Sequence, residues 1–198
     1  MNVNVLLEPK LDLPRLVEVL DTLGHLGRVD TIRGWNKATQ SRLFEAVKGF
    51  RPLTLDHFVP PATEPLVEVI HHGKNTLPVW THFQKRFTRP KDPEAHKDQL
   101  WGYNHQDLSP LTGPGYFTTV PGAAEGEVDI DYRKIPPEKP SAWPPIAPNG
   151  GIVPGLVYGG MVDVMRGIST HVSIGRAMKK GKWMNAWFVL CREDPENK

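Results

Sequence analysis

This chain has almost no cysteine, no strong excess of charge and no long apolar run. Its single cysteine, Cys191, excludes an internal disulfide and a cysteine-rich zinc site. A net charge of +2 over 198 residues argues against a dedicated nucleic-acid-binding protein, which usually carries a strong basic excess. No apolar run approaches the length that crosses a membrane, so we expect no integral membrane association.

Targeting and catalytic motifs are absent as well. The first residues lack the basic and long apolar regions of a secretory signal, which predicts a cytoplasmic protein. The chain has no G-x-S-x-G elbow, no P-loop, no G-x-G-x-x-G after a strand and no H-E-x-x-H motif. We therefore predict neither a cofactor nor a metal site, and no motif specifies a reaction.

Proline and glycine are plentiful. The 20 prolines and 18 glycines favour short strands joined by turns over long helices. The length and an apolar content of 39% allow one domain with a substantial hydrophobic core. Cys191 lies in the apolar run 187–191, so we expect a buried cysteine that behaves as a small hydrophobic residue.

The first part of the chain has helical patterns. Leucine and valine recur at three and four residues over 13–23, where Asp12 can cap and Pro14 suits the first turn. A second helix is predicted over 37–48, before Gly49. Because two short helices rarely fold alone, residues 1–58 are predicted to be a helical extension that packs on the main body.

The middle of the chain is predicted to be mostly strands and loops. Residues 127–133 alternate most cleanly, with Glu127, Asp129 and Asp131 on a face that we expect to be solvated. Residues 77–87 are predicted to be a helix, because Trp80, Phe83 and Phe87 would share a buried face. The basic residues of this helix would form its solvent-exposed face. Further strands are predicted at 66–72, 100–106 and 115–120, and a proline-rich loop at 135–151.

Residues 155–192 are the most informative part of the chain. Their pattern predicts a short helix to residue 168, a half-polar strand over 169–178, a Lys/Gly turn and a final apolar strand. Small ligand-binding barrels close on hairpins of this kind. We take 59–193 as the barrel domain and 194–198 as a polar tail.

With these segments placed, residues 66–192 resemble the bacterial GXWXG/DUF4334-type proteins, which have a lipocalin-like barrel. The matching residues are HHGKN at 71–75, KRF at 85–87, Tyr158, Asp163, Arg166, Ile168, Gly175 and WFVLCRE at 187–193. This chain departs from the family in having His72 where an aromatic residue is expected. The resemblance implies a barrel with a cavity, and a D-x-x-R helix that contains Asp163 and Arg166.

The predicted fold is therefore α+β: an antiparallel lipocalin-like (calycin-type) β-barrel of eight to ten strands with a helical N-terminal extension. A barrel of about eight strands can enclose one small ligand. We predict that it binds a small, largely apolar molecule such as a lipid, a fatty acid or an aromatic metabolite. The predicted ligand-binding residues are Arg166, His171, Tyr158, Tyr103, His72, His105, Asp163, Trp101 and Trp187, with Phe117, Ile174 and Val189 as further apolar walls.

Several of these residues also have structural interpretations. Asp163 and Arg166 can form an ion pair across one helical turn, or Arg166 can anchor a ligand carboxylate or phosphate. His171 can be a surface or core histidine, or it can face the barrel interior beside Ser169 and Ser173. His71 and His72 are adjacent on a strand, so only one of them can point inward.

Two other functions stay open. A histidine with a tyrosine or a carboxylate could perform acid–base chemistry in the same cavity, as an isomerase, cyclase or dehydratase does. Alternatively, the basic segment near residue 85 and the proline-rich segment 136–148 could be contact surfaces of an interaction module. The sequence leaves the oligomeric state open.

Overall fold

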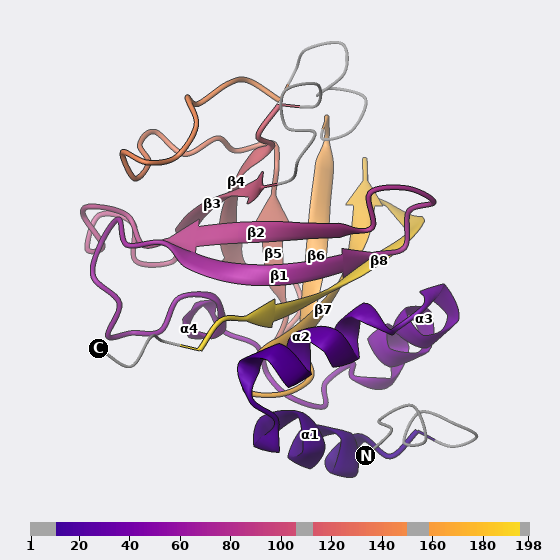
Figure 1. Cartoon of the computed structure of the whole chain (residues 1–198). Helices are drawn as coiled ribbons and strands as arrows, with labels where there is room; N and C mark the ends of the chain where they lie inside the picture. The colour runs from indigo at the N-terminus through magenta and orange to yellow at the C-terminus, as the bar shows by residue number, and fades with distance from the viewer. Residues whose placement is uncertain (1–10, 106–112, 150–158, 195–198) are drawn as a thin grey trace.

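The barrel is closed. A computed structural model describes residues 11–105, 113–149 and 159–194, in which four helices precede eight antiparallel strands. Each strand pairs with the next along the chain, and the last pairs with the first (Figure 1). The predicted antiparallel β-barrel is confirmed at this level. Eight strands leave an interior that side chains can fill or that can hold one small ligand.

The helices are α1 (Leu13–Thr22), α2 (His25–Arg33), α3 (Lys37–Ala46) and α4 (Leu55–Phe58). The strands are β1 (Val69–Asn75), β2 (His82–Thr88), β3 (Leu100–His105), β4 (Tyr116–Pro121), β5 (Val128–Asp131), β6 (Met161–Gly167), β7 (Val172–Lys179) and β8 (Lys182–Arg192). Within the described ranges, none of the helices is both long enough and apolar enough to span a lipid bilayer.

The two predicted N-terminal helices are confirmed. The Asp12 side chain caps α1 by accepting a hydrogen bond from the backbone N–H of Arg15 at 3.1 Å. Asn36 caps α3 in the same way, through the N–H of Thr39 at 3.0 Å. Helix α2 was not predicted, because its few apolar residues do not form a clear helical face; in the structure one of them, Leu26, is 81% exposed.

Helices α1, α2 and α3 lie together against the outer face of β7 and β8 (Figure 1). Leu16, Leu20 and Leu43 pack there in one apolar cluster with Val189 and Cys191, all of them fully buried. The predicted burial of Cys191 is confirmed, and burial raises the pKa of its thiol to about 11.

The helix predicted over 77–87 is wrong. Residues 82–88 form β2, which pairs with β1 and β3 along its length. Phe83, Lys85 and Phe87 alternate along this strand, so a period of two competes with the helical spacing of Trp80, Phe83 and Phe87. Trp80 lies in the loop before β2, with a φ of 49° and 65% of its surface exposed.

The short helix predicted before residue 168 is also wrong in its described part. Residues 161–167 form β6, which pairs with β5 and β7. Asp163 and Arg166 are an odd number of residues apart on a strand, so they point to opposite faces and the predicted ion pair between them does not form. Tyr158 lies outside the described residues.

Other predictions are confirmed. The strands predicted at 100–106, 115–120 and 127–133 are observed at 100–105, 116–121 and 128–131. The predicted turn between β7 and β8 is formed by Lys180 and Gly181, with φ of 51° and 74°. The solvated acidic face is wrong at Asp131, which is 3% exposed and accepts hydrogen bonds from Arg133.

The described part of the proline-rich loop has no helix or strand, as predicted. Trp143 in this loop is buried against Tyr103 and Tyr116, on the outer face of β3 and β4. Its indole N–H donates to the Glu68 carboxylate at 2.5 Å. This tryptophan therefore packs on its own barrel.

Candidate binding site inside the barrel

A cluster of four polar side chains lies inside the barrel. Lys85, Asn104, Tyr132 and Asp163 are each at most 6% exposed. Lys85 Nζ lies 3.2 Å from Asp163 Oδ2 and donates to Asn104 Oδ1 at 2.9 Å. It also contacts the Tyr132 hydroxyl, which donates to Asp163 Oδ2 at 3.2 Å. Each member of this polar cluster is therefore bonded to at least one other.

Strand register explains why these side chains meet. Asp163 pairs with Ile130, and both belong to the set of residues that points inward. Lys85 lies between Phe83 and Phe87 on the inward face of β2, and Asn104 is two residues from inward Gly102 on β3. Four residues far apart in the sequence thus share one small volume.

Aromatic rings surround the lysine. Nζ of Lys85 lies 5.0 Å from the ring centres of Phe117 and Phe188, 4.9 Å from that of Tyr132 and 5.8 Å from that of Phe83. At such distances an ammonium group is attracted by the faces of aromatic rings.

Inward-facing glycines make room for these rings. A Cβ on Gly73 would lie 2.6 Å from the Phe83 ring, and one on Gly102 would overlap the Phe117 ring. A Cβ on Gly175 would likewise overlap the Phe188 ring. Each ring thus lies over a neighbouring strand at a position where any larger side chain would displace it.

Burial shifts both charged groups toward their neutral forms. Desolvation lowers the pKa of Lys85, although the nearby Asp163 carboxylate opposes the shift. Desolvation likewise raises the pKa of Asp163, opposed by Lys85 and by the Tyr132 hydroxyl. The proton between these two groups is therefore held less firmly by the lysine than it would be in water.

The two ends of the barrel differ. Asn104, Tyr132 and Asp163 lie near the end where β3 and β5 stop and β6 starts. At the opposite end, the apolar side chains of Phe58 and Val59 from the α4 region join the interior core and fill it. The end that holds the polar cluster is thus the one that α4 does not fill.

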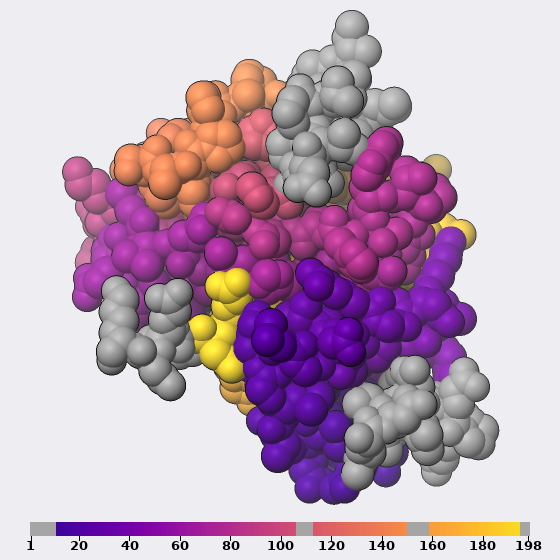
Figure 2. All heavy atoms as spheres, in the orientation of Figure 1, coloured from indigo at the N-terminus to yellow at the C-terminus, as the bar shows by residue number. Residues whose placement is uncertain are grey.

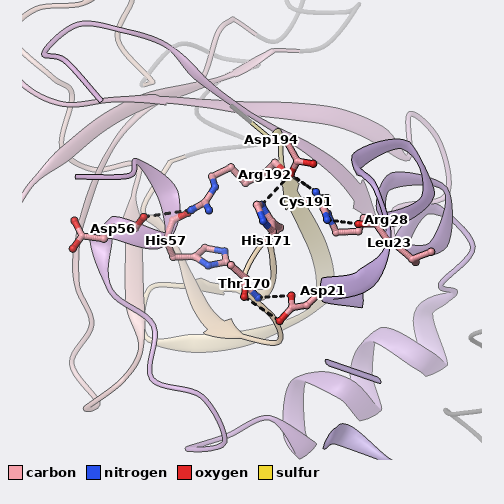
Figure 3. Close-up of polar contacts among 10 residues, drawn as sticks. All are labelled: Asp21, Leu23, Arg28, Asp56, His57, Thr170, His171, Cys191, Arg192 and Asp194. Atoms are coloured by element: carbon pink, nitrogen blue, oxygen red, sulfur yellow. Dashed lines mark hydrogen bonds and ion pairs between the residues drawn. The ribbon is translucent and has the colours of Figure 1, made fainter. Parts of the chain in front are cut away.

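The filled end is held together by polar contacts among several elements (Figure 3). Asp21 of α1 accepts hydrogen bonds from the backbone N–H of Thr170 at 2.9 Å and from its hydroxyl at 3.0 Å. Arg28 of α2 pairs with Asp194, just beyond β8. The Arg192 guanidinium donates to the backbone carbonyl of His57. These contacts fasten the helices to the β6–β7 turn and to the end of β8.

Among the predicted ligand-binding residues that the structure describes, Asp163 lies inside the barrel, whereas Arg166 lies on the outer wall. Arg166 donates to Glu127 Oε1 at 2.7 Å and to the backbone carbonyl of Phe44 at 2.7 Å. Its guanidinium also lies 3.9 Å from the centre of the Phe44 ring. Arg166 therefore attaches α3 to the barrel through its contacts with Phe44.

The predicted aromatic residues also face outward. Tyr103 packs on Trp143, Trp101 lies against the His96 ring, and Trp187 belongs to the cluster under the helices. Ile174 and Val189 are in that same outer cluster, whereas Phe117 lines the interior as predicted. Assigning the wrong face to a strand exchanges all of its candidates at once.

The predicted histidines are spread over the molecule. His71 is the inward member of the adjacent pair, and its Nε2 lies 2.9 Å from the backbone carbonyl oxygen of Phe58. His72 points outward, toward Glu193. His171 lies in the β6–β7 turn with Nδ1 3.3 Å from Asp194 Oδ1, and His105 is exposed at the end of β3. None of these lies in the polar cluster.

Lys85, Asn104 and Tyr132 were not predicted as site residues. The available signal was a lysine at the centre of an alternating F-x-K-x-F run, which places a charge on the apolar side of a strand. The helical assignment of residues 77–87 concealed it. Tyr132 was predicted to lie on the apolar face of its strand. The structure places it in the interior core, where its hydroxyl is a polar group among apolar side chains.

Three pockets lined by described residues lie elsewhere, and one of them, of about 350 Å³, is lined by residues 61–65 and Arg89. A second of about 560 Å³ is lined by Glu68, Arg86 and Trp143 beneath the proline-rich loop. Another of about 350 Å³ lies between the residues before α4 and the β4–β5 turn.

Searches against protein-family models, curated proteins and solved structures find no match to this chain.

Proposed function

We propose that the barrel binds a small, largely apolar molecule that presents one acidic or carbonyl oxygen to Lys85. The observation that supports this is a buried lysine, hydrogen-bonded to Asn104 and ringed by Phe83, Phe117 and Phe188. A buried ion pair usually costs more in desolvation than it returns, so it is weak as a device for stability. Ligand sites commonly combine apolar walls with a few convergent polar groups of perturbed pKa.

The ligand enters from the end that holds Asn104, Tyr132 and Asp163, because the α4 residues fill the other end. Its oxygen replaces Asn104 Oδ1 as an acceptor from Lys85, and the Tyr132 hydroxyl turns from Asp163 to provide a second donor. Its apolar body lies against the phenylalanine rings. The resemblance to the GXWXG/DUF4334-type proteins supports the same proposal, since it implies a lipocalin-like barrel with a cavity.

Native mass spectrometry of the gently purified protein comes first, followed by denaturation to release anything bound. A titration with 11-(dansylamino)undecanoic acid and with its methyl ester then tests the acid preference by fluorescence. We expect the acid to bind, and the ester to bind about tenfold more weakly, since a hydrogen bond to a charged group contributes about 1.5–3 kcal/mol.

Two matched variants locate the site. Tyr132→Phe removes a hydroxyl from the interior, and Tyr103→Phe removes one from the outer wall. We expect weaker binding of the acid to the first and unchanged binding to the second. Equal affinities for the wild-type protein, Tyr132→Phe and Lys85→Met would overturn the proposal, as would the absence of any bound molecule together with a flat titration.

A second candidate is an acid–base enzyme that uses the same polar cluster. The Tyr132 hydroxyl contacts both Lys85 and Asp163, and burial shifts the pKa of each charged group toward its neutral form. Proton exchange with a bound ligand tests this alternative: solvent deuterium should enter the released molecule when it is incubated with the wild-type protein and not with Tyr132→Phe. A ligand that binds without exchange or conversion supports the binding protein.

A further inference from the structure

Three side chains with metal-binding atoms converge on the outside of the barrel. His25 is the first residue of α2, His72 points outward from β1, and Glu193 directly follows β8. One potential ligand atom from each lies within 4.8 Å of the other two. The residues directly after β8 reach the surface between the N-terminal helices and the first strands (Figure 2).

Hydrogen bonding holds two of the three in register. The backbone N–H of Glu193 donates to the Ile70 carbonyl at 2.9 Å, extending the β1–β8 ladder by one residue. His72 Nε2 lies 2.6 Å from Glu193 Oε1. The rings of His25 and His72 have their centres 5.2 Å apart, so the helix places the third group beside this pair.

One ring nitrogen of His25 is without a hydrogen-bond partner among the described residues. This atom, Nδ1, is buried. Arg28 also lies near, but it is paired with Asp194.

We propose that His25, His72 and Glu193 bind a divalent transition-metal ion, with Zn²⁺ the best match. Two imidazoles and one carboxylate form a common zinc ligand set, with a fourth position left for water. With bonds of about 2.0 Å the ligand atoms lie roughly 3.3 Å apart in a tetrahedral site. The His72–Glu193 pair opens slightly to admit the ion, and His25 moves toward it by side-chain rotation. The bound ion would fasten α2 to the seam between β1 and β8.

The test uses the whole 198-residue chain after treatment with EDTA. Zn²⁺ is titrated in competition with a chromophoric chelator, and bound zinc is counted by elemental mass spectrometry. We expect one ion per chain, and an affinity at least about tenfold lower in each of His25→Gln, His72→Gln and Glu193→Gln. The control His82→Gln removes an exposed histidine from β2 and should bind zinc as the wild-type protein does.

Circular dichroism confirms that each variant is folded, and thermal unfolding gives an independent readout. Zn²⁺ should raise the Tm of the wild-type protein and of His82→Gln, but not that of His72→Gln, because only binding to the folded state stabilises it. Wild-type protein that takes up no stoichiometric zinc overturns the proposal. So does binding that the three ligand variants leave unchanged. Neither result depends on the barrel interior, so this proposal and the ligand proposal can fail separately.

Discussion

Nζ of Lys85 lies 3.2 Å from Oδ2 of Asp163 inside the barrel, and both side chains are at most 4% exposed. The pair is surrounded by phenylalanine rings and completed by the Tyr132 hydroxyl. Burial opposes the charged form of each partner, so their attraction is offset by desolvation. Such a pair is therefore weak evidence of a stabilising role.

Removing one partner should be worse than removing both. Lys85→Met and Asp163→Leu should each lower the free energy of unfolding by about 3–5 kcal/mol, because each strands a buried charge. The double variant should lie within about 1 kcal/mol of the wild-type protein, or above it. Urea unfolding measures all three. A double variant as unstable as the sum of the single variants would mean that the two residues are not energetically coupled, and would contradict the stranded-charge argument.

The glycines under the rings should not tolerate alanine. Gly102→Ala should cost about 1–3 kcal/mol, because the new methyl overlaps the Phe117 ring and the Arg86 carbonyl. Gly27→Ala is the control, since Gly27 lies within α2 and its Cβ would meet Leu23 no closer than 3.4 Å. This change should stabilise the protein by up to about 1 kcal/mol. Thermal or urea unfolding compares the two, and equal effects would contradict the packing argument.

Stability should fall as the pH drops below about 6.5. Burial lowers the pKa of His71 to about 3 and that of His57 well below its usual value, so both stay neutral in the folded protein. Between the unfolded pKa of about 6.5 and the folded pKa, the unfolded chain binds protons that the folded chain does not. The stability contributed by a neutral His71 is therefore complete above this window and lost as the pH falls through it, by about 2 kcal/mol between pH 7 and 5.

Urea unfolding at pH 7, 6 and 5 checks this prediction. His71→Gln cannot take up the proton and should flatten the dependence on pH, leaving the share that belongs to His57. The exposed His105 provides a control, and His105→Gln should keep the wild-type slope. If His71→Gln keeps that slope as well, the neutral buried histidine is not its source.

Arg166 should matter for the attachment of α3. Arg166→Gln breaks the contacts with Glu127 and with the Phe44 carbonyl, so we expect a loss of about 1–3 kcal/mol in unfolding free energy. Arg15→Gln removes an exposed partner of Glu18 and should change stability by no more than about 0.5 kcal/mol. Binding to the barrel interior should survive in both variants, and a selective loss of ligand in folded Arg166→Gln would restore Arg166 as a ligand anchor.

Much of the element pattern could be predicted because it depends on local chemistry. Asp12 and Asn36 cap their helices through side chains that are adjacent in sequence, and the turn at 180–181 needs residues that accept positive φ. The alternation over 128–132 likewise needs no distant partner to be recognised. These features are encoded within a few residues.

The errors arose where two periods compete. Trp80, Phe83 and Phe87 match a helix, whereas Phe83, Lys85 and Phe87 match a strand, and hydrogen bonds to β1 and β3 decide between them. The same holds for 161–167, which pairs on both sides within the barrel. A helix satisfies its own backbone, while a strand depends on partners that are remote in sequence.

The sequence by itself determined the helix caps, the turns, the alternating strands and the single buried cysteine. Only the tertiary structure decided which face of each strand points inward, because the two faces of a strand are equivalent until the barrel closes and one becomes the core. That choice moved Arg166 and Tyr103 to the outer wall. It brought Lys85, Asn104, Tyr132 and Asp163 together inside, where burial gives the lysine and the aspartate properties that neither has alone.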